Sequence, residues 1–313
     1  MSKNEMPDSM YEKTLLIANM YYKNKMSQQE IATKLNISRP WVSKILARAE
    51  ELGIVKIEVI SPFANSSALE NALMKRYPLK HVNVIKTSDN SKDEVAQTAA
   101  NYFISNLRPK DVVAVGWGRA VSRIISVTPT VYFPDVHVVP MAGSFGSSIN
   151  LLPTYNTIAL SQRLNSKVHM LHTPAMCETQ EEYDALTSSH HTKELLHMAE
   201  KADVLLLGIG AFETSIVPEY GILHEKDINL LKKAEAIGDV ALQYLDKNGN
   251  PVDTVSTKRM IKADIFKATS NARTVIGMAE GIHKVPIIHV ALASKLINTF
   301  FTDEKTALAL LEF

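Results

Sequence analysis

The sequence has little cysteine and no long apolar run. Cys177 is the single cysteine among 313 residues, so neither an internal disulfide nor a metal cluster built on thiolates can form. No apolar run approaches the roughly 18 residues that a membrane span requires. The polar residues Ser2 to Asn4 and the acidic Glu5 stand where a signal peptide would be apolar. We therefore expect a cytoplasmic protein that does not associate with a membrane.

The chain also lacks a strong net charge and any biased composition. Its formal net charge is +1, with 46% hydrophobic and 21% charged residues, which is ordinary usage for a globular protein. A chain of this length exceeds what one hydrophobic core usually serves. We expect one large domain and one small domain.

The small net charge conceals a basic segment near the N-terminus. Residues 23–48 carry a local charge of +5, because six basic residues stand against the single acid Glu30. The basic residues are Lys23, Lys25, Lys34, Arg39, Lys44 and Arg48. Such a concentration attracts a polyanion such as DNA, although a solvated basic face is the alternative.

Three helices are predicted in and before this segment. The apolar spacing predicts a first helix from about Tyr11 to Tyr22. Ser27 and Glu30 have the spacing of a capping box and predict the start of a second helix. Asn36 tolerates left-handed dihedral angles and can end that helix. Ser38 then caps a third helix, which has Pro40 in its first turn.

The apolar residues of the second and third helices predict a helix-turn-helix. Its small core consists of Ile31, Ala32, Leu35, Ile37, Val42 and Ile45. In this motif the N-terminal part of the last helix faces base edges in the major groove of double-stranded DNA. The candidate DNA-binding residues are Ser27, Gln28, Ser38, Arg39, Pro40, Trp41, Ser43, Lys44 and Arg48.

Individual side chains suggest different DNA contacts. Arg39 could pair with guanine through two hydrogen bonds, while Ser43 and Lys44 could reach bases or phosphates. Trp41 could meet a thymine methyl group or pack on a neighbouring helix. The alternating segment Ile54–Ile60 predicts a strand and hence a winged variant of the motif. We predict a DNA-binding domain at 1–61, a linker at 62–67 and an effector-binding and oligomerisation domain at 68–313.

Beyond residue 80, short apolar strands alternate with helical segments. This alternation predicts an α/β fold with a mostly parallel sheet, whose ligands lie beyond the carboxyl ends of the strands. The predicted strands are His81–Ile85, Asp111–Gly116, His137–Pro140, Lys167–Leu171, Asp203–Ile209, Thr274–Met278 and Leu296–Phe300. The predicted helices include Lys92–Leu107, Thr154–Asn165 and Thr192–Lys201.

Four glycine-bearing segments follow predicted strands. A glycine lets backbone N–H groups approach an anion at the start of a helix. Arg119 and Lys284 could add charge for a phosphate, and Asp239 could accept sugar hydroxyls or only cap the following turn. The candidate effector-binding residues are Gly116, Trp117, Gly118, Arg119, Ala120, Met141, Ala142, Gly143, Gly208, Gly210, Asp239, Glu280 and Lys284.

An enzyme is the main alternative, in the form of a phosphosugar isomerase or deaminase with a DNA-binding module attached. Asp239, Glu280 and His283 are acid–base candidates, but the sequence supplies no pair with an evident proton path. A nicotinamide site is not favoured, because Val121 replaces the third glycine of that fingerprint. We predict no catalytic residue, no cofactor and no metal.

The order of the motifs resembles the SorC family of sugar-responsive bacterial transcriptional regulators over nearly the whole chain. The matching segments are 21–22, 27–32, 36–40, 42–43, 115–118, 208–210, 238–239 and 246–249. The resemblance implies an effector domain related in fold to phosphosugar isomerases, a homo-oligomer (dimer or tetramer) and a sugar-phosphate effector. It also implies that Gly116–Ala120 is a phosphate-proximal loop and that Lys284 is the family's late basic residue.

Two departures from the family pattern bear on the effector. Met141 stands where some relatives have lysine or arginine, so its side chain can form neither a Schiff base nor an anion contact. Ala120 and Glu280 replace small or hydroxyl-bearing residues, and a second acid near the pocket would disfavour a highly anionic effector. The expected function is DNA-binding regulation of a carbohydrate-utilisation operon, controlled by a small sugar-derived effector.

Overall fold

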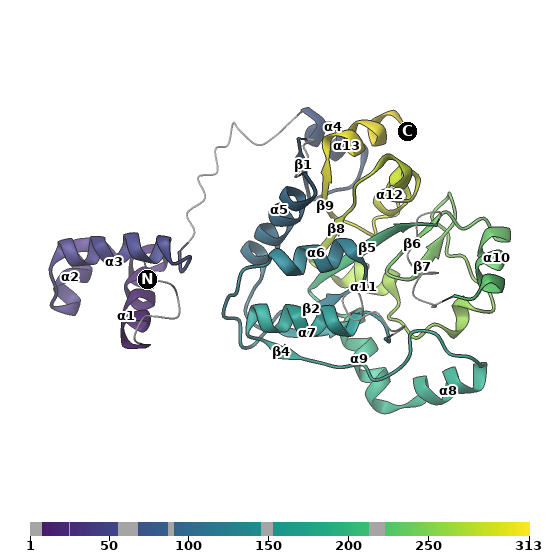
Figure 1. The fold of residues 1–313 in the computed structure, drawn as a ribbon, viewed down its shortest axis with the longest axis horizontal. Coiled ribbons are helices and arrows are strands. Elements are labelled where there is room, and N and C mark those ends of the chain that lie inside the picture. The colour runs from purple at the N-terminus through teal and green to yellow at the C-terminus, as the bar shows by residue number, and fades with distance from the viewer. Residues whose placement is uncertain (1–7, 25, 56–67, 87–90, 145–152, 213–222) are drawn as a thin grey trace. The chain divides into compact units, whose positions relative to one another are not determined.

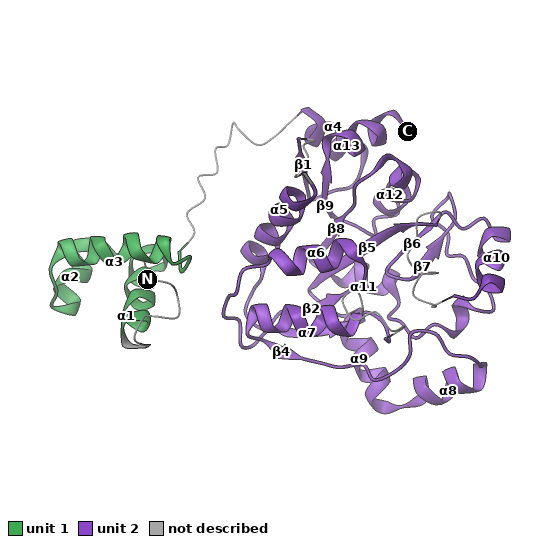
Figure 2. Ribbon diagram, viewed as in Figure 1, with its two compact units in different colours: residues 1–65 green, residues 66–313 purple. Residues whose placement is uncertain are grey.

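The chain divides into two compact units, which are described separately. The computed structural model describes residues 8–24, 26–55, 68–86, 91–144, 153–212 and 223–313. The smaller unit is residues 1–65 and the larger is residues 66–313 (Figure 2). The predicted linker, 62–67, lies outside the described residues, and the predicted domain boundaries stay predictions.

The smaller unit contains three α-helices around one apolar core. They are α1 (Asp8–Ala18), α2 (Gln28–Leu35) and α3 (Arg39–Glu51), and a π-helical turn at Asn19–Lys23 extends α1 (Figure 1). The predicted core is confirmed: Ile31, Ala32, Val42 and Ile45 are buried together with Ile17, Met20 and Leu46, and Leu35 and Ile37 pack against them.

The ends of α2 and α3 form as the sequence predicts. Ser27 Oγ accepts a hydrogen bond from the Glu30 backbone N–H (3.2 Å), and Glu30 Oε2 accepts one from the Ser27 N–H (2.7 Å). This capping box satisfies two backbone donors that the helix leaves unpaired. Asn36 adopts a left-handed conformation (φ 52°) and ends α2, and Ser38 caps α3. A turn of three residues therefore joins the two helices.

In this unit, the start of the first helix differs from its prediction, and the predicted strand is described only in part. The first helix starts at Asp8 rather than at Tyr11, and its last apolar residues belong to the π-helical turn. Residues 56–60 of the predicted strand Ile54–Ile60 lie outside the described residues, and Ile54 and Val55 are not in a strand. The winged variant therefore stays a prediction.

The larger unit contains a mostly parallel sheet, which confirms the predicted α/β class. The parallel strands follow the order β1-β9-β8-β5-β2-β3-β4. They are β1 (His81–Ile85), β2 (Val112–Val115), β3 (His137–Pro140), β4 (Lys167–Val168), β5 (Val204–Ala211), β8 (Thr274–Met278) and β9 (Thr299–Asp303). The predictions were wrong in length for β4, which has two residues, and in position for β9, which starts at Thr299 and not Leu296.

Helices cover both faces of this sheet, so alternate residues of each strand enter different cores. On β2, Val113 and Val115 belong to one core and Ala114 to the other. The first face carries α5 (Ser91–Asn106), α6 (Arg119–Val127) and α7 (Pro153–Leu164). The second carries α4 (Ala68–Arg76), α9 (His190–Glu200), α11 (Ile265–Asn271), α12 (Val285–Ala293) and α13 (Glu304–Glu312). The described residues also form α8 (Gln180–Ser188), α10 (Glu225–Lys233) and two 3₁₀ turns, Thr257–Arg259 and Ile282–Lys284.

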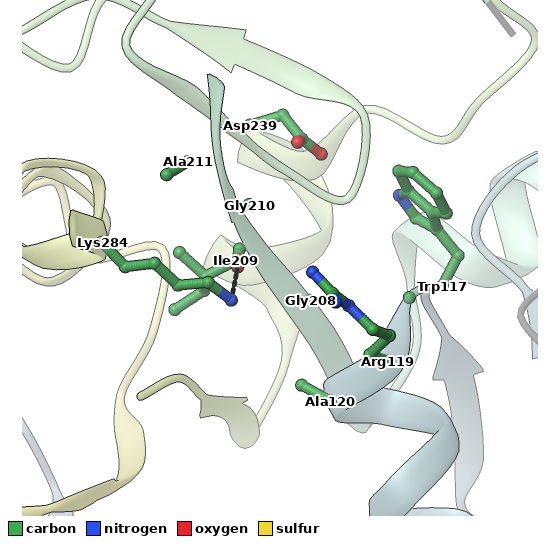
Figure 3. A pocket seen from close by; sticks show the side chains of 10 residues that line it. Trp117, Arg119, Ala120, Gly208, Ile209, Gly210, Ala211, Asp239 and Lys284 are labelled. Atoms are coloured by element: carbon green, nitrogen blue, oxygen red, sulfur yellow. Dashed lines mark hydrogen bonds between the residues drawn. The ribbon is translucent and has the colours of Figure 1, made fainter. Parts of the chain in front are cut away.

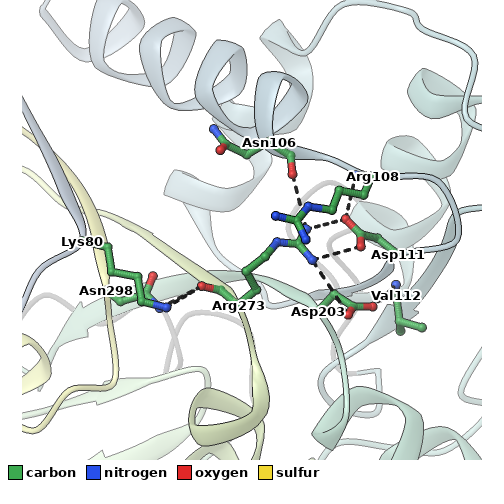
Figure 4. Close-up of polar contacts among 8 residues, drawn as sticks. All are labelled: Lys80, Asn106, Arg108, Asp111, Val112, Asp203, Arg273 and Asn298. Atoms are coloured by element: carbon green, nitrogen blue, oxygen red, sulfur yellow. Dashed lines mark hydrogen bonds and ion pairs between the residues drawn. The ribbon is translucent and has the colours of Figure 1, made fainter.

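An ion-pair network joins the amino ends of the central strands (Figure 4). The Arg273 guanidinium donates to both carboxylate oxygens of the buried Asp111, at 2.6 and 3.2 Å. Asp203 lies 3.9 Å from the same guanidinium and accepts the N–H of Val112 (2.9 Å). These contacts hold together the edge of the sheet opposite the carboxyl ends of the strands.

A small antiparallel extension, which the sequence analysis missed, follows β5. Strands β6 (Gly238–Val240) and β7 (Gln243–Leu245) form a hairpin with a two-residue turn, and β6 pairs with residues 209–211 of β5. Both turn residues, Ala241 (φ 50°) and Leu242 (φ 69°), have positive φ angles. Turns of this kind usually contain Asn or Gly, so no residue pattern predicts a hairpin here.

Candidate functional site

A pocket lies where β2 and β5 end side by side. After β2 the chain crosses to β3 on one side, whereas β5 leads toward β8 on the other, so the connections diverge at this point. In open α/β sheets such a divergence leaves a crevice where ligands bind. The pocket encloses about 470 Å³, part of it open to solvent. Its lining residues are Trp117, Gly118, Arg119, Ala120, Gly208, Ile209, Gly210, Ala211, Asp239 and Lys284 (Figure 3).

One side of the pocket is electropositive. Helix α6 starts at Arg119, and its N-cap Gly118 (φ 98°) has no side chain to accept the first N–H groups. These N–H groups and the helix dipole favour an anion. Lys284 adds a second cation, and its Nζ donates to the Ile209 carbonyl on β5 (3.2 Å) (Figure 3). Burial lowers the pKa of Lys284, and the charge of Arg119 lowers it further.

The opposite side presents one buried carboxylate. Asp239 on β6 is 3% exposed, and its Oδ2 accepts the backbone N–H of Leu242 (2.9 Å). Burial raises the pKa of Asp239 to about 6, although the Leu242 hydrogen bond and the charges of Lys284 and Lys262 act in the opposite direction. A carboxylate in such a site accepts hydrogen bonds strongly, because little water competes for it.

Two glycines are necessary for this geometry. A Cβ atom on Gly210 would lie 2.6 Å from Asp239 Oδ1, so any larger residue would displace the carboxylate. A Cβ atom on Gly208 would collide with the carbonyl oxygen of Trp117, which belongs to the loop that follows β2. Gly208 lies within β5, as the predicted strand Asp203–Ile209 has it, and Gly210 also lies within β5, which extends two residues beyond that prediction.

The turn of the β6–β7 hairpin is fixed to the pocket. The Ala241 N–H donates to the Gly208 carbonyl (3.2 Å), and Asp239 holds the N–H of Leu242. Two non-glycine residues with positive φ store about 1–2 kcal/mol each.

The pocket brings together eight of the thirteen predicted effector residues. They are Trp117, Gly118, Arg119, Ala120, Gly208, Gly210, Asp239 and Lys284. The alternative role of Asp239 as a cap is also observed, through its hydrogen bond to Leu242. Sequence analysis missed Ile209 and Ala211, which line the pocket next to the glycines of β5. The glycines next to Ile209 and Ala211 were the sequence signal that could have identified these two residues as part of the pocket.

Five predicted residues lie elsewhere. Met141 is 1% exposed in the core between the sheet and its second helix layer, and Ala142 is buried in a separate apolar cluster with Trp117. Gly143 packs against the backbone of Pro174. Gly116 is buried and pairs with Leu206 on β5 (2.8 Å). None of these four lines the pocket, because each is used in packing or in backbone pairing.

The fifth, Glu280, follows β8 and is largely covered by its neighbours. Its Oε2 lies 3.6 Å from Arg123 of α6, outside the pocket lining. Burial raises the pKa of Glu280, and Arg123 opposes that shift. The expected repulsion between this acid and an anionic effector is therefore offset by an adjacent cation.

The predicted DNA-binding residues lie at the start of α2 and along α3 in the smaller unit. Ser27, Ser38, Arg39, Pro40, Ser43 and Lys44 are exposed, whereas Gln28, Trp41 and Arg48 are half-buried. Trp41 packs against the core of the three helices, which was the second possibility for this side chain. The first two turns of α3 therefore leave the guanidinium of Arg39 and the ammonium of Lys44 accessible to a ligand.

Two kinds of feature are absent from the described residues. No helix among them is long and apolar enough to cross a membrane. They also contain no group of three histidine, cysteine or acidic side chains placed to hold a metal ion.

Comparisons with known proteins agree with this architecture. A family model for a sugar-binding domain matches residues 61–312. The deoxyribonucleoside regulator of Bacillus subtilis is 30% identical over 94% of this chain and 95% of its own length. The sorbitol operon regulator of Klebsiella pneumoniae is 29% identical over 95% of this chain and 96% of its own length.

A solved structure extends the likeness to the fold. The full-length sorbitol operon regulator SorC from Klebsiella pneumoniae superposes with a TM-score of 0.73 at 27% identity, and covers 97% of this chain and 100% of that one. The family model and these two relatives each span most of the chain. The chain belongs to the SorC family of sugar-binding transcriptional regulators.

Proposed function

We propose that this protein binds operator DNA through α2 and α3 and regulates a carbohydrate-utilisation operon in response to a phosphorylated sugar. One observation carries the effector assignment. A single pocket holds an uncapped helix N-terminus and two cations on one side, and a buried carboxylate on the other. The relatives named as deoxyribonucleoside and sorbitol operon regulators support a sugar-derived ligand.

The two sides of the pocket suit the two ends of a sugar phosphate. The phosphate would accept hydrogen bonds from the first N–H groups of α6 and from Arg119 and Lys284. The sugar hydroxyls would donate to Asp239, whose Oδ1 is not engaged by the Leu242 N–H. Met141 is excluded from this role because its side chain is buried in the core.

For DNA binding, we propose that α2 and α3 act as a helix-turn-helix with α3 in the major groove. The exposed residues at the start of α3 are those that meet base edges in such motifs. A dimer or tetramer would present two copies to half-sites about 34 Å apart, or a multiple of that distance. The effector would then change operator affinity by binding unequally to two arrangements of the oligomer.

The effector assignment is tested by thermal shift and calorimetry on the full chain. The panel contains glucose 6-phosphate, ribose 5-phosphate, sorbitol 6-phosphate and the three unphosphorylated compounds. At least one phosphorylated member should raise Tm in wild type, because a ligand specific for the folded state stabilises it. Lys284→Met and Asp239→Asn should each lose that shift, while Lys267→Met on the exposed face of α11 should keep it. A shift that survives both pocket substitutions would place the ligand elsewhere.

The DNA assignment is tested with a fragment that the full chain selects from a random-sequence pool. Arg39→Ala should cost about 1–3 kcal/mol on this fragment and relax specificity, if Arg39 reads a base. Lys44→Ala should lower the salt slope by about 1, if Lys44 contacts a phosphate. Lys13→Ala on α1 is the control. Equal losses on selected and random DNA would exclude base reading by Arg39.

We further propose that the pocket binds its ligand without turning it over. Sugar isomerisation requires a base and an acid on the substrate. Asp239 is the single carboxylate that lines the described pocket, and Lys284 is the proposed phosphate ligand, so no acid–base pair is left for the sugar carbons. Incubation of the panel with pure protein should give no product, and measurable turnover would restore the enzyme alternative.

A further inference from the structure

Helix α12 connects the pocket with α4. It begins directly after Lys284, the cation of the pocket. Helix α4 begins at Ala68, immediately after the residues that lead from the smaller unit in the sequence. A displacement of α12 that starts at the pocket would therefore reach α4, which is the first helix of the larger unit after the DNA-binding residues in the sequence.

The inner face of α12 contacts the pocket region at two points. Lys284 is its N-cap residue, and the Nζ atom of that lysine binds the Ile209 carbonyl on β5 (3.2 Å). One turn further, Ile287 packs on Gly238, the neighbour of Asp239. A Cβ atom on Gly238 would lie 2.7 Å from Ile287 Cγ1. With so little free space, a displacement of β6 is transmitted to the helix.

The outer face of α12 contacts α4 through one hydrogen bond. His289 lies two residues after Ile287, about 200° further around the helix. Its Nδ1 is 2.8 Å from the hydroxyl of Tyr77, which directly follows α4 and is 3% exposed. Next to it, Arg76 of α4 donates to the Leu311 carbonyl at the end of α13 (2.6 Å). The end of α4 is thus held by α12 and α13 together.

In the tautomer that leaves His289 Nδ1 without a proton, the Tyr77 hydroxyl has two alternative acceptors. It carries one proton, and it lies 2.8 Å from His289 Nδ1 and 3.5 Å from the Leu310 carbonyl. A small shift of α12 relative to α13 would move that proton from one acceptor to the other. Two discrete arrangements of this kind are what a coupling element requires, since an equilibrium between them can be biased from either end.

We propose that the Tyr77–His289 hydrogen bond couples occupancy of the pocket to α4 and so to DNA binding. The proposal rests on the proposed function for its physiological meaning, and on the contacts of α12 for its mechanism. Tyr77 and His289 are positioning residues here, because neither lines the ligand pocket and both would act through α12 and α4. Removing their bond should leave both binding sites intact and weaken the connection between them.

The decisive experiment uses hydrogen exchange of the full chain and needs neither a known effector nor DNA. Lys284→Ala perturbs the start of α12 from within the pocket. In wild type, this substitution should change the exchange rate of amides in α4 by at least about threefold, because it loosens a local opening unit. In the Tyr77→Phe background, the same substitution should leave the α4 rates unchanged. His289→Ala should behave like Tyr77→Phe, and Tyr183→Phe on α8 should behave like wild type.

Two results would overturn the proposal. One is an α4 that does not respond to Lys284→Ala in wild type, and the other is an equal response with and without the Tyr77 hydroxyl. Failure of the sugar-phosphate assignment gives a different pattern, in which no panel member binds but the exchange result stands. Where a panel member does bind, Tyr77→Phe should keep its Kd within about twofold. In wild type, the bound panel member should change the affinity for the selected DNA by the usual 5–150-fold. In Tyr77→Phe, the same compound should change that affinity by less than about threefold.

Discussion

Asp239→Asn should make the larger unit more stable while abolishing effector binding. The pKa of Asp239 is raised from 3.8 to about 6, chiefly by burial. A raised carboxyl pKa means that the folded state disfavours the ionised form. The ionised carboxylate therefore destabilises the fold at neutral pH, and its replacement by a neutral amide of similar shape removes that cost.

The size of the effect follows from the shift of about two pH units. Each unit corresponds to about 1.36 kcal/mol, so the cost is about 3 kcal/mol at pH 8. Below pH 3.8 the carboxyl is protonated in both states and the cost vanishes. Between the two pKa values the cost grows as pH rises, and it is about 1 kcal/mol at pH 4.5. These values are upper limits, because Asn accepts the Leu242 N–H less strongly than a carboxylate does.

The assay is calorimetric unfolding of wild type and Asp239→Asn at pH 4.5, 6 and 8. The gain in Tm should be largest at pH 8, up to about 6–12 °C for a unit of this size, and should shrink toward pH 4.5. Asp246→Asn is the matched control. Hydrogen bonds from Asn250 lower the pKa of Asp246, which means that the folded state favours the ionised carboxylate. Replacing this carboxylate by an amide should therefore lower Tm at pH 8. A gain for Asp239→Asn that does not depend on pH, or a loss at pH 8, would refute the reasoning.

Three other substitutions test individual structural features. Asn36→Ala should lower the stability of the smaller unit by about 1–2 kcal/mol in thermal unfolding, while Asn36→Gly should not, because the residue has a left-handed conformation. Arg273→Met should cost about 3 kcal/mol in urea unfolding, since it leaves the carboxylate of the buried Asp111 without its cation. Ala241→Gly should stabilise the larger unit by about 1 kcal/mol by relieving its positive φ, and an unchanged urea midpoint would argue against strain in this turn.

The features that sequence predicted correctly depend on short-range chemistry. The capping box at Ser27 and the helix end at Asn36 involve residues only three or four positions apart, so their geometry follows from local hydrogen bonding. The parallel sheet is similarly visible, because strands buried on both faces have continuous apolar sequences.

The features that sequence missed depend on contacts between distant segments. The β6–β7 hairpin has Ala241 and Leu242 in a turn that usually contains Asn or Gly, and hydrogen bonds to the Gly208 carbonyl and to Asp239 Oδ2 stabilise it. Met141 follows Val139 by two positions, so the alternation of β3 directs both side chains to the same core. Period-two reasoning could have excluded Met141 from the pocket. The position of Glu280 beside Arg123 could not be foreseen, since these residues are far apart in the sequence.

The most direct test of the account is calorimetric titration of the panel's sugar phosphates into the full chain, free and saturated with the selected DNA fragment. The account predicts that one phosphorylated member binds in both states with affinities that differ by about 5–150-fold. It also predicts that Asp239→Asn and Lys284→Met abolish this binding. Identical affinity with and without DNA, or full binding to both variants, would contradict it.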